Sequence, residues 1–413
     1  NMASTCIIDS KGYRTLIKII AIMMGIFQIV VAGYGFIVIN MRCAIHLTFA
    51  LTLIAMLKPV RFKSNLLTDV YNIAFTLICL GCGLFLTYET RSAYVLPYTL
   101  NGPSQMDVIV GTIILILVLV GTRRTTGNAL PIICSVFILY AMFGQYLPGL
   151  LTHKAYKWRS IVDVVVFTSE GLYGQPLSIA SSYVAAFVLF GSFLSITGAG
   201  QWFIDMAFSL TGKYRSGPAM TAVVSSAAMG TISGTGVANV VTTGAFTIPL
   251  MKSCGYSPTM AGAVEATAST GGQIMPPIMG AAAFLMAEYI GIPYAKVAVK
   301  AILPAILYFT GIFISVHLEA KKLGLRGIPR DQLPKWGLLA RDCYLILPLI
   351  LLVWLVSSGA KTMSHSAAYS ILAAIVVGLV NFFLTRMRSA EEKSAKLSLI
   401  HISEPTSLAL ISY

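Results

Sequence analysis

Apolar runs separated by short polar loops fill most of the chain. Runs approaching about 20 apolar residues are long enough to cross the hydrocarbon core of a bilayer as helices. They lie near residues 19–39, 44–57, 73–88, 108–120, 129–151, 177–197, 301–317, 344–357 and 369–384. A helix satisfies its backbone hydrogen bonds internally, which lipid cannot do for it. The pattern therefore predicts an all-α polytopic membrane protein with about ten transmembrane helices.

Two glycine-rich segments almost without charge interrupt this pattern: Met229-Gly-Thr-Ile-Ser-Gly-Thr-Gly-Val-Ala-Asn239 and Ala268-Ser-Thr-Gly-Gly-Gln-Ile-Met-Pro-Pro277. The first joins two apolar stretches of residues 217–250, each too short to span, with basic residues at both ends. This predicts a re-entrant helical hairpin. The second interrupts residues 259–290, too long for one span, and predicts a discontinuous helix with an unwound middle.

Both breaks have a physical cost in the membrane. Glycine loosens helical geometry and proline removes an N–H, so we expect each break to leave backbone groups without intrahelical partners. A bound ion, a solute or an internal water would satisfy these groups. The breaks are therefore the candidate site.

The composition agrees with a membrane protein. The chain is 57% hydrophobic and 11% charged, against roughly 25% charged residues in soluble domains. Its 29 Lys and Arg exceed 15 Asp and Glu, for a net charge of +14. These basic residues lie in short loops between apolar runs, where they are topology signals. We expect contact with the lipid bilayer and not with nucleic acid, and the basic residues from Lys11 to Lys18 place the N-terminus in the cytoplasm.

The pattern divides the chain into five parts. We expect a small four-helix membrane domain over residues 1–124, and connecting and scaffold helices over residues 125–216. A transport core with the hairpin and the broken helix follows over residues 217–300, and further membrane helices over residues 301–390. Residues 391–413 leave the pattern, and we interpret them as a non-native tail, with a native soluble tail as the alternative.

The two breaks together suit a small hard cation. Half-helix ends and freed carbonyls attract ions, and all-oxygen ligation suits Na⁺. The candidate ion-binding residues are Ser233, Gly234, Thr235, Gly236, Thr270, Gly271, Gly272, Pro276 and Pro277. The residues expected to face a solute are Ser233, Asn239, Ser269 and Gln273. The alternative is that the glycines and small residues only permit close helix packing.

Glu265 lies within the first half of the broken helix. A carboxyl group at membrane depth is costly, and is a functional candidate for that reason. Glu265 is therefore a candidate proton site. The alternative is a near-surface glutamate that pairs with Lys252 or with a helix terminus.

At these residues the chain resembles the fused membrane subunit of tripartite ATP-independent periplasmic (TRAP) transporters, in the form that works with TAXI-type binding proteins. The resemblance runs from residues 168–177 through Leu189-Phe-Gly-Ser-Phe-Leu194, Gly198-Ala-Gly200 and both breaks to residues 279–288. It implies that residues 233–236 and 271–277 are the first hairpin tip and the first unwound helix of that family. The four spans before Arg124 fit the small subunit fused in front.

The resemblance implies an elevator-type secondary transporter of the bacterial inner membrane. It would import an organic acid from a periplasmic TAXI-type binding protein, with Na⁺ or H⁺ as coupling ion and no other cofactor. The second inverted repeat of the family is missing, which we interpret as a C-terminal truncation.

The rival hypotheses are a channel, a non-transporting scaffold and an intramembrane enzyme. Polar groups cluster at two breaks instead of along a continuous pore, which favours a carrier over a channel. An enzyme is not expected: the chain has no Walker motif, and its five histidines lie at or near span ends, away from the breaks.

Overall fold

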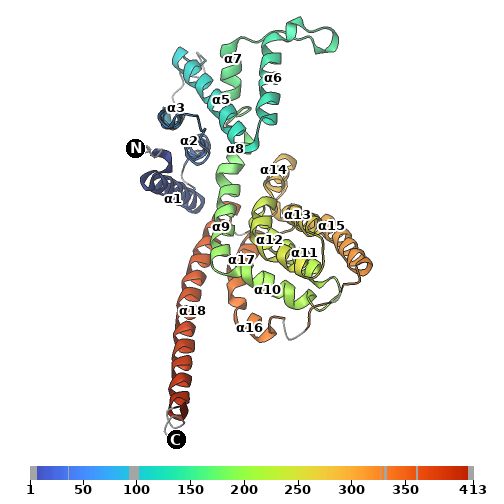
Figure 1. Cartoon of the computed structure of the whole chain (residues 1–413). Coiled ribbons are helices and arrows are strands. Elements are labelled where there is room, and N and C mark those ends of the chain that lie inside the picture. The colour runs from blue at the N-terminus through green and yellow to red at the C-terminus, as the bar shows by residue number, and fades with distance from the viewer. Residues whose placement is uncertain are drawn as a thin grey trace. The chain divides into compact units, whose positions relative to one another are not determined.

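The computed structural model describes residues 7–35, 37–92, 102–325, 327–329, 333–359 and 361–407, and every regular element in this part is helical (Figure 1). Two compact units, Asn1–Ala185 and Ala186–Tyr413, make up the chain. This division coincides with none of the four boundaries between the five parts expected from the sequence, and those boundaries stay predictions. Residues 408–413 of the expected tail lie outside the described residues.

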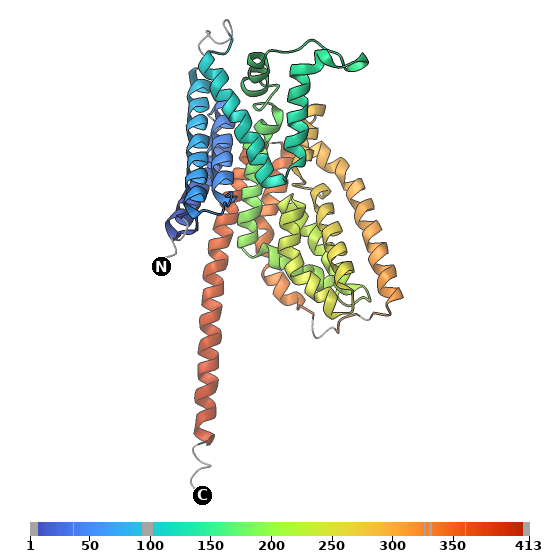
Figure 2. The ribbon, with the colours of Figure 1, turned by 45° about the horizontal axis from the view of Figure 1, so that its top comes forward.

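The described part of unit 1 is built on long helices. These are α1 (Lys11–Tyr34), α2 (Ile39–Leu57), α3 (Asn65–Ser92), α5 (Gln105–Thr126) and α6 (Ala129–Phe143). Shorter helical elements are η1 (Ile7–Asp9), η2 (Gly144–Tyr146), η3 (Gly149–Leu151), α7 (Trp158–Val162), η4 (Asp163–Phe167), α8 (Gln175–Ile179) and η5 (Ala180–Val184). Figure 2 shows α1, α2 and α3 side by side, in blue.

Local sequence explains where these helices begin and how closely they pack. Ser104 and Asp107 form a capping box at the start of α5, with N–H···O distances of 3.2 and 2.7 Å. The box satisfies two amides that the first helical turn leaves unpaired. In α3, a Cβ at Gly83 would lie 2.1 Å from the hydroxyl oxygen of Thr48 in α2. Glycine at this position lets the two helices approach closely.

Unit 2 contains the two segments singled out in the sequence. Its described elements are α9 (Ala185–Ile196), which begins at the last residue of unit 1, α10 (Ala199–Thr211), α11 (Gly217–Ser233), α12 (Gly236–Ser253), α13 (Pro258–Gly271), η6 (Gly272–Ile274), α14 (Ala281–Ile290), α15 (Tyr294–Lys322), α16 (Trp336–Arg341), η8 (Cys343–Ile346), α17 (Leu347–Ser358) and α18 (Met363–Ser407). In Figures 1 and 2, α11, α12 and α13 lie together and α15 runs beside α13.

The interior between these four helices contains alanines of α11, α13 and α15 beside larger side chains such as Phe309. Ala222 of α11, Met251 of α12, Ala268 of α13 and Val316 of α15 are all buried in one apolar cluster. Alanine and glycine allow short distances between helix axes, and this brings the hydroxyl groups of neighbouring helices within reach of one another.

The polytopic prediction is confirmed for the described residues by length and composition. Eight helices are long and apolar enough to cross a membrane: Lys11–Tyr34, Ile39–Leu57, Asn65–Glu89, Gln105–Thr126, Ala129–Tyr146, Gln175–Ile196, Tyr294–Lys322 and Met363–Met387. The two other expected crossings consist of shorter helices. The broken segment ends in α14, of 10 residues, and the span expected near residues 344–357 contains α17, of 12 residues.

No span is expected from the sequence at residues 199–211, where α10 lies. The buried residues Phe203, Ile204 and Ala207 recur at helical spacing on this element, which packs against α11. Gln201 is exposed and Asp205 is half-buried. With 13 residues and these polar positions, α10 is too short and too polar for a membrane span. Its amphipathic period is that of a helix packed on one side.

Candidate functional site

The hairpin between α11 and α12 reverses the chain within two residues. α11 ends at Ser233, and Gly234 follows in the left-handed region with φ 60° and ψ 2°. Thr235 is extended, and α12 begins at Gly236. A Cβ at Gly234 would lie 2.3 Å from the carbonyl oxygen of Met279, so both the backbone conformation and the neighbour require glycine here. The predicted hairpin is confirmed as a helix–turn–helix, and its re-entry into a membrane stays a prediction.

The predicted interruption of the next helix is also confirmed. α13 ends at Gly271, one tight turn forms η6, and α14 restarts at Ala281. The peptide bond between Pro276 and Pro277 is cis. The N–H of Gly280 donates to the carbonyl oxygen of Gln273 at 2.7 Å, which closes the unwound segment into a compact loop.

The two breaks lie against each other. A Cβ at Gly230 would lie 2.2 Å from the Cα of Gly272, so the backbones of α11 and η6 touch with no side chain between them. A Cβ at Gly236 would lie 2.8 Å from Nε2 of Gln273 and 3.4 Å from the carbonyl oxygen of Ser269. The glycines thus permit close packing of the two breaks. The alternative that they do only this stays a prediction. Ion binding at the same breaks stays a prediction.

Several carbonyl oxygens at the breaks accept hydrogen bonds from the protein itself. The carbonyl oxygen of Thr235 accepts from the N–H of Asn239 at 3.1 Å. The carbonyl oxygen of Gly272 accepts from the N–H of Met275 at 3.2 Å. That of Pro277 accepts from the Tyr294 hydroxyl at 2.8 Å. The expectation of groups without intrahelical partners is wrong for the carbonyls of Thr235 and Gly272, which are paired within α12 and within the tight turn of η6. It is correct for the carbonyl of Pro277, whose donor is a tyrosine of another helix. Each oxygen keeps a second lone pair.

Asn239 supplies a buried oxygen without a donor. Its side chain is fully buried, and its Nδ2 donates to the carbonyl oxygen of Ser226 at 2.8 Å. Its Oδ1 has no hydrogen-bond partner in the described structure. The amide lies beside the second break, since a Cβ at Gly272 would be 3.0 Å from Nδ2. Leaving such an acceptor unpaired costs about 1–3 kcal/mol, so this oxygen is open to a cation or to a donor group.

Glu265 of α13 is fully buried among hydroxyl groups. Its Oε1 accepts from Ser226 at 3.0 Å, from Ser269 at 3.1 Å and from Thr243, and its Oε2 accepts from Thr247. The donors come from α11, α12 and α13 itself. One carboxyl group therefore connects both arms of the hairpin to the broken helix.

This geometry settles the alternatives for the position of Glu265. Lys252 is exposed near the end of α12, and none of the ion pairs formed by the described residues includes Glu265. The alternative of a near-surface glutamate paired with Lys252 is wrong, because α11 and α12 cover the carboxyl group with hydroxyl-bearing faces.

The other expected site residues differ in exposure. Thr235, Thr270 and Gln273 are exposed, and Ser233, Pro276 and Pro277 are half-buried. Ser269 and Asn239 are fully buried, so the four residues expected to face a solute do not share an open surface in this structure. Their contact with a solute stays a prediction.

Two tyrosines of α15, not singled out in the sequence, support the broken helix. The ring of Tyr294 stacks on Phe284 at 4.5 Å and 10°, while its hydroxyl reaches the carbonyl oxygens of Pro277 and Ile278. The hydroxyl of Tyr308 donates to the carbonyl oxygen of Thr267 at 2.9 Å. No local signal marks such donors, because they act on residues far from them along the chain.

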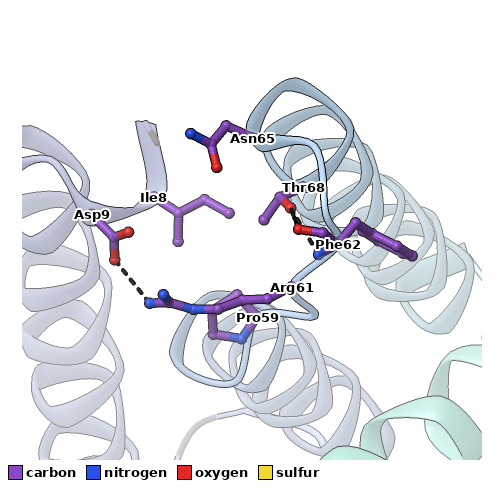
Figure 3. A pocket seen from close by; sticks show the side chains of 7 residues that line it. All are labelled: Ile8, Asp9, Pro59, Arg61, Phe62, Asn65 and Thr68. Carbon is purple, nitrogen blue, oxygen red and sulfur yellow. Dashed lines mark hydrogen bonds and ion pairs between the residues drawn. The ribbon is translucent and has the colours of Figure 1, made fainter. Parts of the chain in front are cut away.

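A cavity of about 140 Å³ in unit 1 contains none of the expected site residues (Figure 3). It is lined by Ile8, Asp9, Pro59, Arg61, Phe62, Asn65 and Thr68. Its two charged groups, Asp9 and Arg61, pair with each other at 3.1 Å. The Thr68 hydroxyl accepts from the N–H of Phe62 at 2.9 Å. These contacts hold the loop between α2 and α3, and they make this cavity a structural feature.

Comparison with known proteins places the chain among transporter permeases. It is 27% identical over 260 residues to an uncharacterized protein, y4mL, of Sinorhizobium fredii, covering 62% of this chain and 57% of that protein. It is 27% identical over 207 residues to the C4-dicarboxylate TRAP transporter large permease protein DctM of Pseudomonas aeruginosa, and this match covers 50% of this chain and 47% of that protein. It is 25% identical over 260 residues to the isethionate TRAP transporter permease protein DctMQ of Oleidesulfovibrio alaskensis, and this match covers 61% of this chain and 40% of that protein. The matches span about half the length of these relatives.

A family model matches a larger part of the chain. Residues 113–406 match the DctM component of the tripartite ATP-independent periplasmic transporter, and this range contains the hairpin and the broken helix. It also includes residues 391–406 of the segment interpreted as a non-native tail, whose origin stays a prediction. Since the match covers more than half of the chain, the protein belongs to the DctM family of tripartite ATP-independent periplasmic transporter permeases.

Proposed function

We propose that this protein is the permease of a binding-protein-dependent secondary transporter that imports an organic acid with Na⁺ or H⁺. The observation that carries the proposal is the contact between the hairpin tip and the unwound segment, within a chain of the DctM family. Two interrupted helices that meet inside a membrane protein offer polar backbone at a depth where lipid cannot satisfy it.

The chemistry of the breaks fits an anionic solute. α12 and α14 start at Gly236 and Ala281, and neither helix has a side chain that caps its first amides. Uncapped N-terminal amides attract carboxylates. The names of two of these relatives include a C4-dicarboxylate and isethionate, both of them organic anions. An organic acid is therefore the solute class that we propose.

The same region has oxygen atoms for a coupling cation. We place Na⁺ beside the breaks at residues 233–236 and 270–272, with Pro276 and Pro277 nearby. The unpaired Oδ1 of Asn239 supports this, because it is a buried oxygen without a donor beside Gly272. Oxygen ligands without thiolate or imidazole suit a hard cation. Bound there, Na⁺ would supply positive charge that holds the two breaks and an anionic solute together.

The proposal extends to a partner and to a cellular setting. We propose a periplasmic solute-binding protein of the TAXI type as partner, a fused small subunit in the first spans, and alternating access by an elevator movement. The protein would lie in the bacterial inner membrane, with its N-terminus in the cytoplasm.

Uptake of a radiolabelled C4-dicarboxylate into proteoliposomes tests this proposal. The permease is reconstituted with and without its binding protein, and a Na⁺ gradient or a pH gradient is imposed. We expect uptake that requires both the binding protein and one of the gradients. Uptake at full rate without the partner would indicate an ordinary symporter, and uptake that follows only the solute gradient without saturation would indicate a channel.

A pair of matched variants tests the site. Ser233→Leu places a large apolar side chain at the hairpin tip and should abolish uptake without loss of membrane insertion. Ser315→Leu makes the same change at an exposed position of α15 and should leave uptake unchanged. Normal transport by Ser233→Leu would overturn the site assignment.

A further inference from the structure

Glu265 is a buried acid, and no residue that the structure describes forms an ion pair with it. Its side chain has no exposed surface, and its four polar partners are the neutral hydroxyl groups of Ser226, Thr243, Thr247 and Ser269. An ionised carboxylate in such a place costs several kcal/mol unless a counter-charge accompanies it. A group of this kind either binds a proton or requires a cation.

The helices packed against Glu265 bring no further titratable group into contact with it. α11 and η6 carry none, α13 carries only Glu265 itself, and α12 carries only the exposed Lys252. α15 carries Tyr294, Lys296, Lys300, Tyr308, His317, Glu319, Lys321 and Lys322. Of these, the two tyrosines direct their hydroxyls to carbonyl oxygens of the broken helix, and none has a hydrogen bond or ion pair with Glu265 among those of the described residues.

The hydroxyl groups around Glu265 can satisfy both of its protonation states. In the ionised state all four hydroxyls donate to the carboxylate. Thr243 and Thr247 each have a second acceptor one turn earlier, the carbonyl oxygens of Asn239 at 2.9 Å and of Thr243 at 3.0 Å. In the neutral state Oε2–H donates to the hydroxyl oxygen of Thr247, which then donates to its backbone acceptor. The change requires rotation of hydroxyl groups and no movement of the backbone.

We propose that Glu265 is a proton-binding site that links closure of the hairpin on the broken helix to uptake of a proton. When α11 and α12 separate from α13, water reaches Glu265 and the proton leaves. Because Ser226, Thr243 and Thr247 lie on the hairpin and Glu265 and Ser269 on the broken helix, opening removes the three interhelical hydroxyl partners together.

Infrared difference spectroscopy of the purified chain tests proton binding without any transport assay. The C=O stretching band of a protonated carboxyl group should be present at neutral pH, and it should disappear in Glu265→Gln. Glu288→Gln makes the same substitution at an exposed residue of α14 and should leave the band in place. A band unchanged in Glu265→Gln, or no band from Glu265 at any mildly acidic or neutral pH, would overturn the proposal.

A second experiment uses the proposed transport function and separates its failure from that of the proton site. In proteoliposomes, Glu265→Gln imitates the neutral carboxyl, so it should retain exchange of internal for external solute and lose accumulation driven by a pH gradient. Accumulation at the wild-type level by Glu265→Gln would exclude a role of this proton in coupling. If the wild type moves no solute, the transport proposal fails, while the infrared band still decides whether Glu265 binds a proton.

Discussion

The hydroxyl group of Tyr294 donates a hydrogen bond of 2.8 Å to the carbonyl oxygen of Pro277. This contact joins the start of α15 to the unwound part of the broken helix, in a region where the backbone has few partners of its own. The ring of Tyr294 packs on Phe284 of α14, which in turn stacks on Phe187 of α9 at 5.1 Å. One residue thus combines a donor for the loop with a place in an aromatic stack.

Tyr294→Phe separates these two contributions. The ring stays in the stack, and the carbonyl oxygens of half-buried Pro277 and buried Ile278 lose their donor. We expect a loss of about 1–3 kcal/mol in stability and reduced uptake, measured by thermal unfolding in detergent and in proteoliposomes. Tyr289→Phe is the control, because Tyr289 lies on α14 and is 69% exposed. Equal melting temperatures for the two variants would show that the hydroxyl of Tyr294 is dispensable.

Gly230→Ala tests the contact between the two breaks. The added Cβ would lie 2.2 Å from the Cα of Gly272, and backbone cannot rotate away as a side chain can. We expect destabilisation of about 1–3 kcal/mol from overpacking, read as a lower melting temperature. Gly262→Ala is the matched change on α13, where an added Cβ has no neighbour within 4 Å. That variant should be as stable as the wild type or slightly more stable, since alanine favours helix over glycine.

Asp69 and Asp9 of unit 1 should respond differently to the same substitution. Buried Asp69 accepts hydrogen bonds from the N–H groups of Ile7 and Ile8 at 2.9 and 3.3 Å, whereas Asp9 forms the exposed pair with Arg61. Asp69→Asn brings an NH₂ group toward amide donors and should cost about 1–3 kcal/mol. Asp9→Asn should cost about 1 kcal/mol or less. Thermal unfolding of both variants decides this, and a larger effect at Asp9 would contradict the comparison.

Asp205 of α10 should make the stability of unit 2 dependent on pH. Partial burial raises the pKa of this carboxyl, and the hydrogen bond from Gln201 at 2.9 Å opposes that shift. A raised pKa means that the folded protein holds the proton more tightly than the unfolded chain. The stabilisation is therefore complete below the ordinary pKa of 3.8 and is lost as the pH rises through the raised value.

Melting temperatures of wild type and Asp205→Asn, measured from acidic to neutral pH, test this sign. Asp205→Asn should remove that part of the pH dependence. Gln201→Ala should move the loss of stability to higher pH, because the hydrogen bond that lowers the pKa of Asp205 is gone. A wild-type protein that gains stability through Asp205 as the pH rises would contradict the argument.

The breaks themselves could be predicted because their signals are local. Gly234 adopts a positive φ at the hairpin tip, and α13 stops at Gly271 ahead of a proline pair. Glycine and proline change the local backbone conformation regardless of tertiary contacts, so their effect can be predicted from a single sequence.

The surroundings of Glu265 could be predicted only in part. Thr243 and Thr247 are spaced i, i+4, as are Glu265 and Ser269, so each pair lies on one helix face. This spacing indicates a polar face on α12 and another on α13. Which faces meet depends on tertiary packing, and Ser226 lies 39 residues from Glu265 along the chain. The donors Tyr294 and Tyr308 carry no such periodic signal.

The backbone contact between Gly230 and Gly272 has a mechanical consequence. Two helices that touch through side chains can slide while rotamers adjust, but here no rotamer lies between the Cα atoms to absorb a displacement. Force applied to the hairpin therefore passes directly to the first half of the broken helix. The two elements should therefore not slide past each other, and a separation of the hairpin from α13 that exposes Glu265 should be a rotation about this contact.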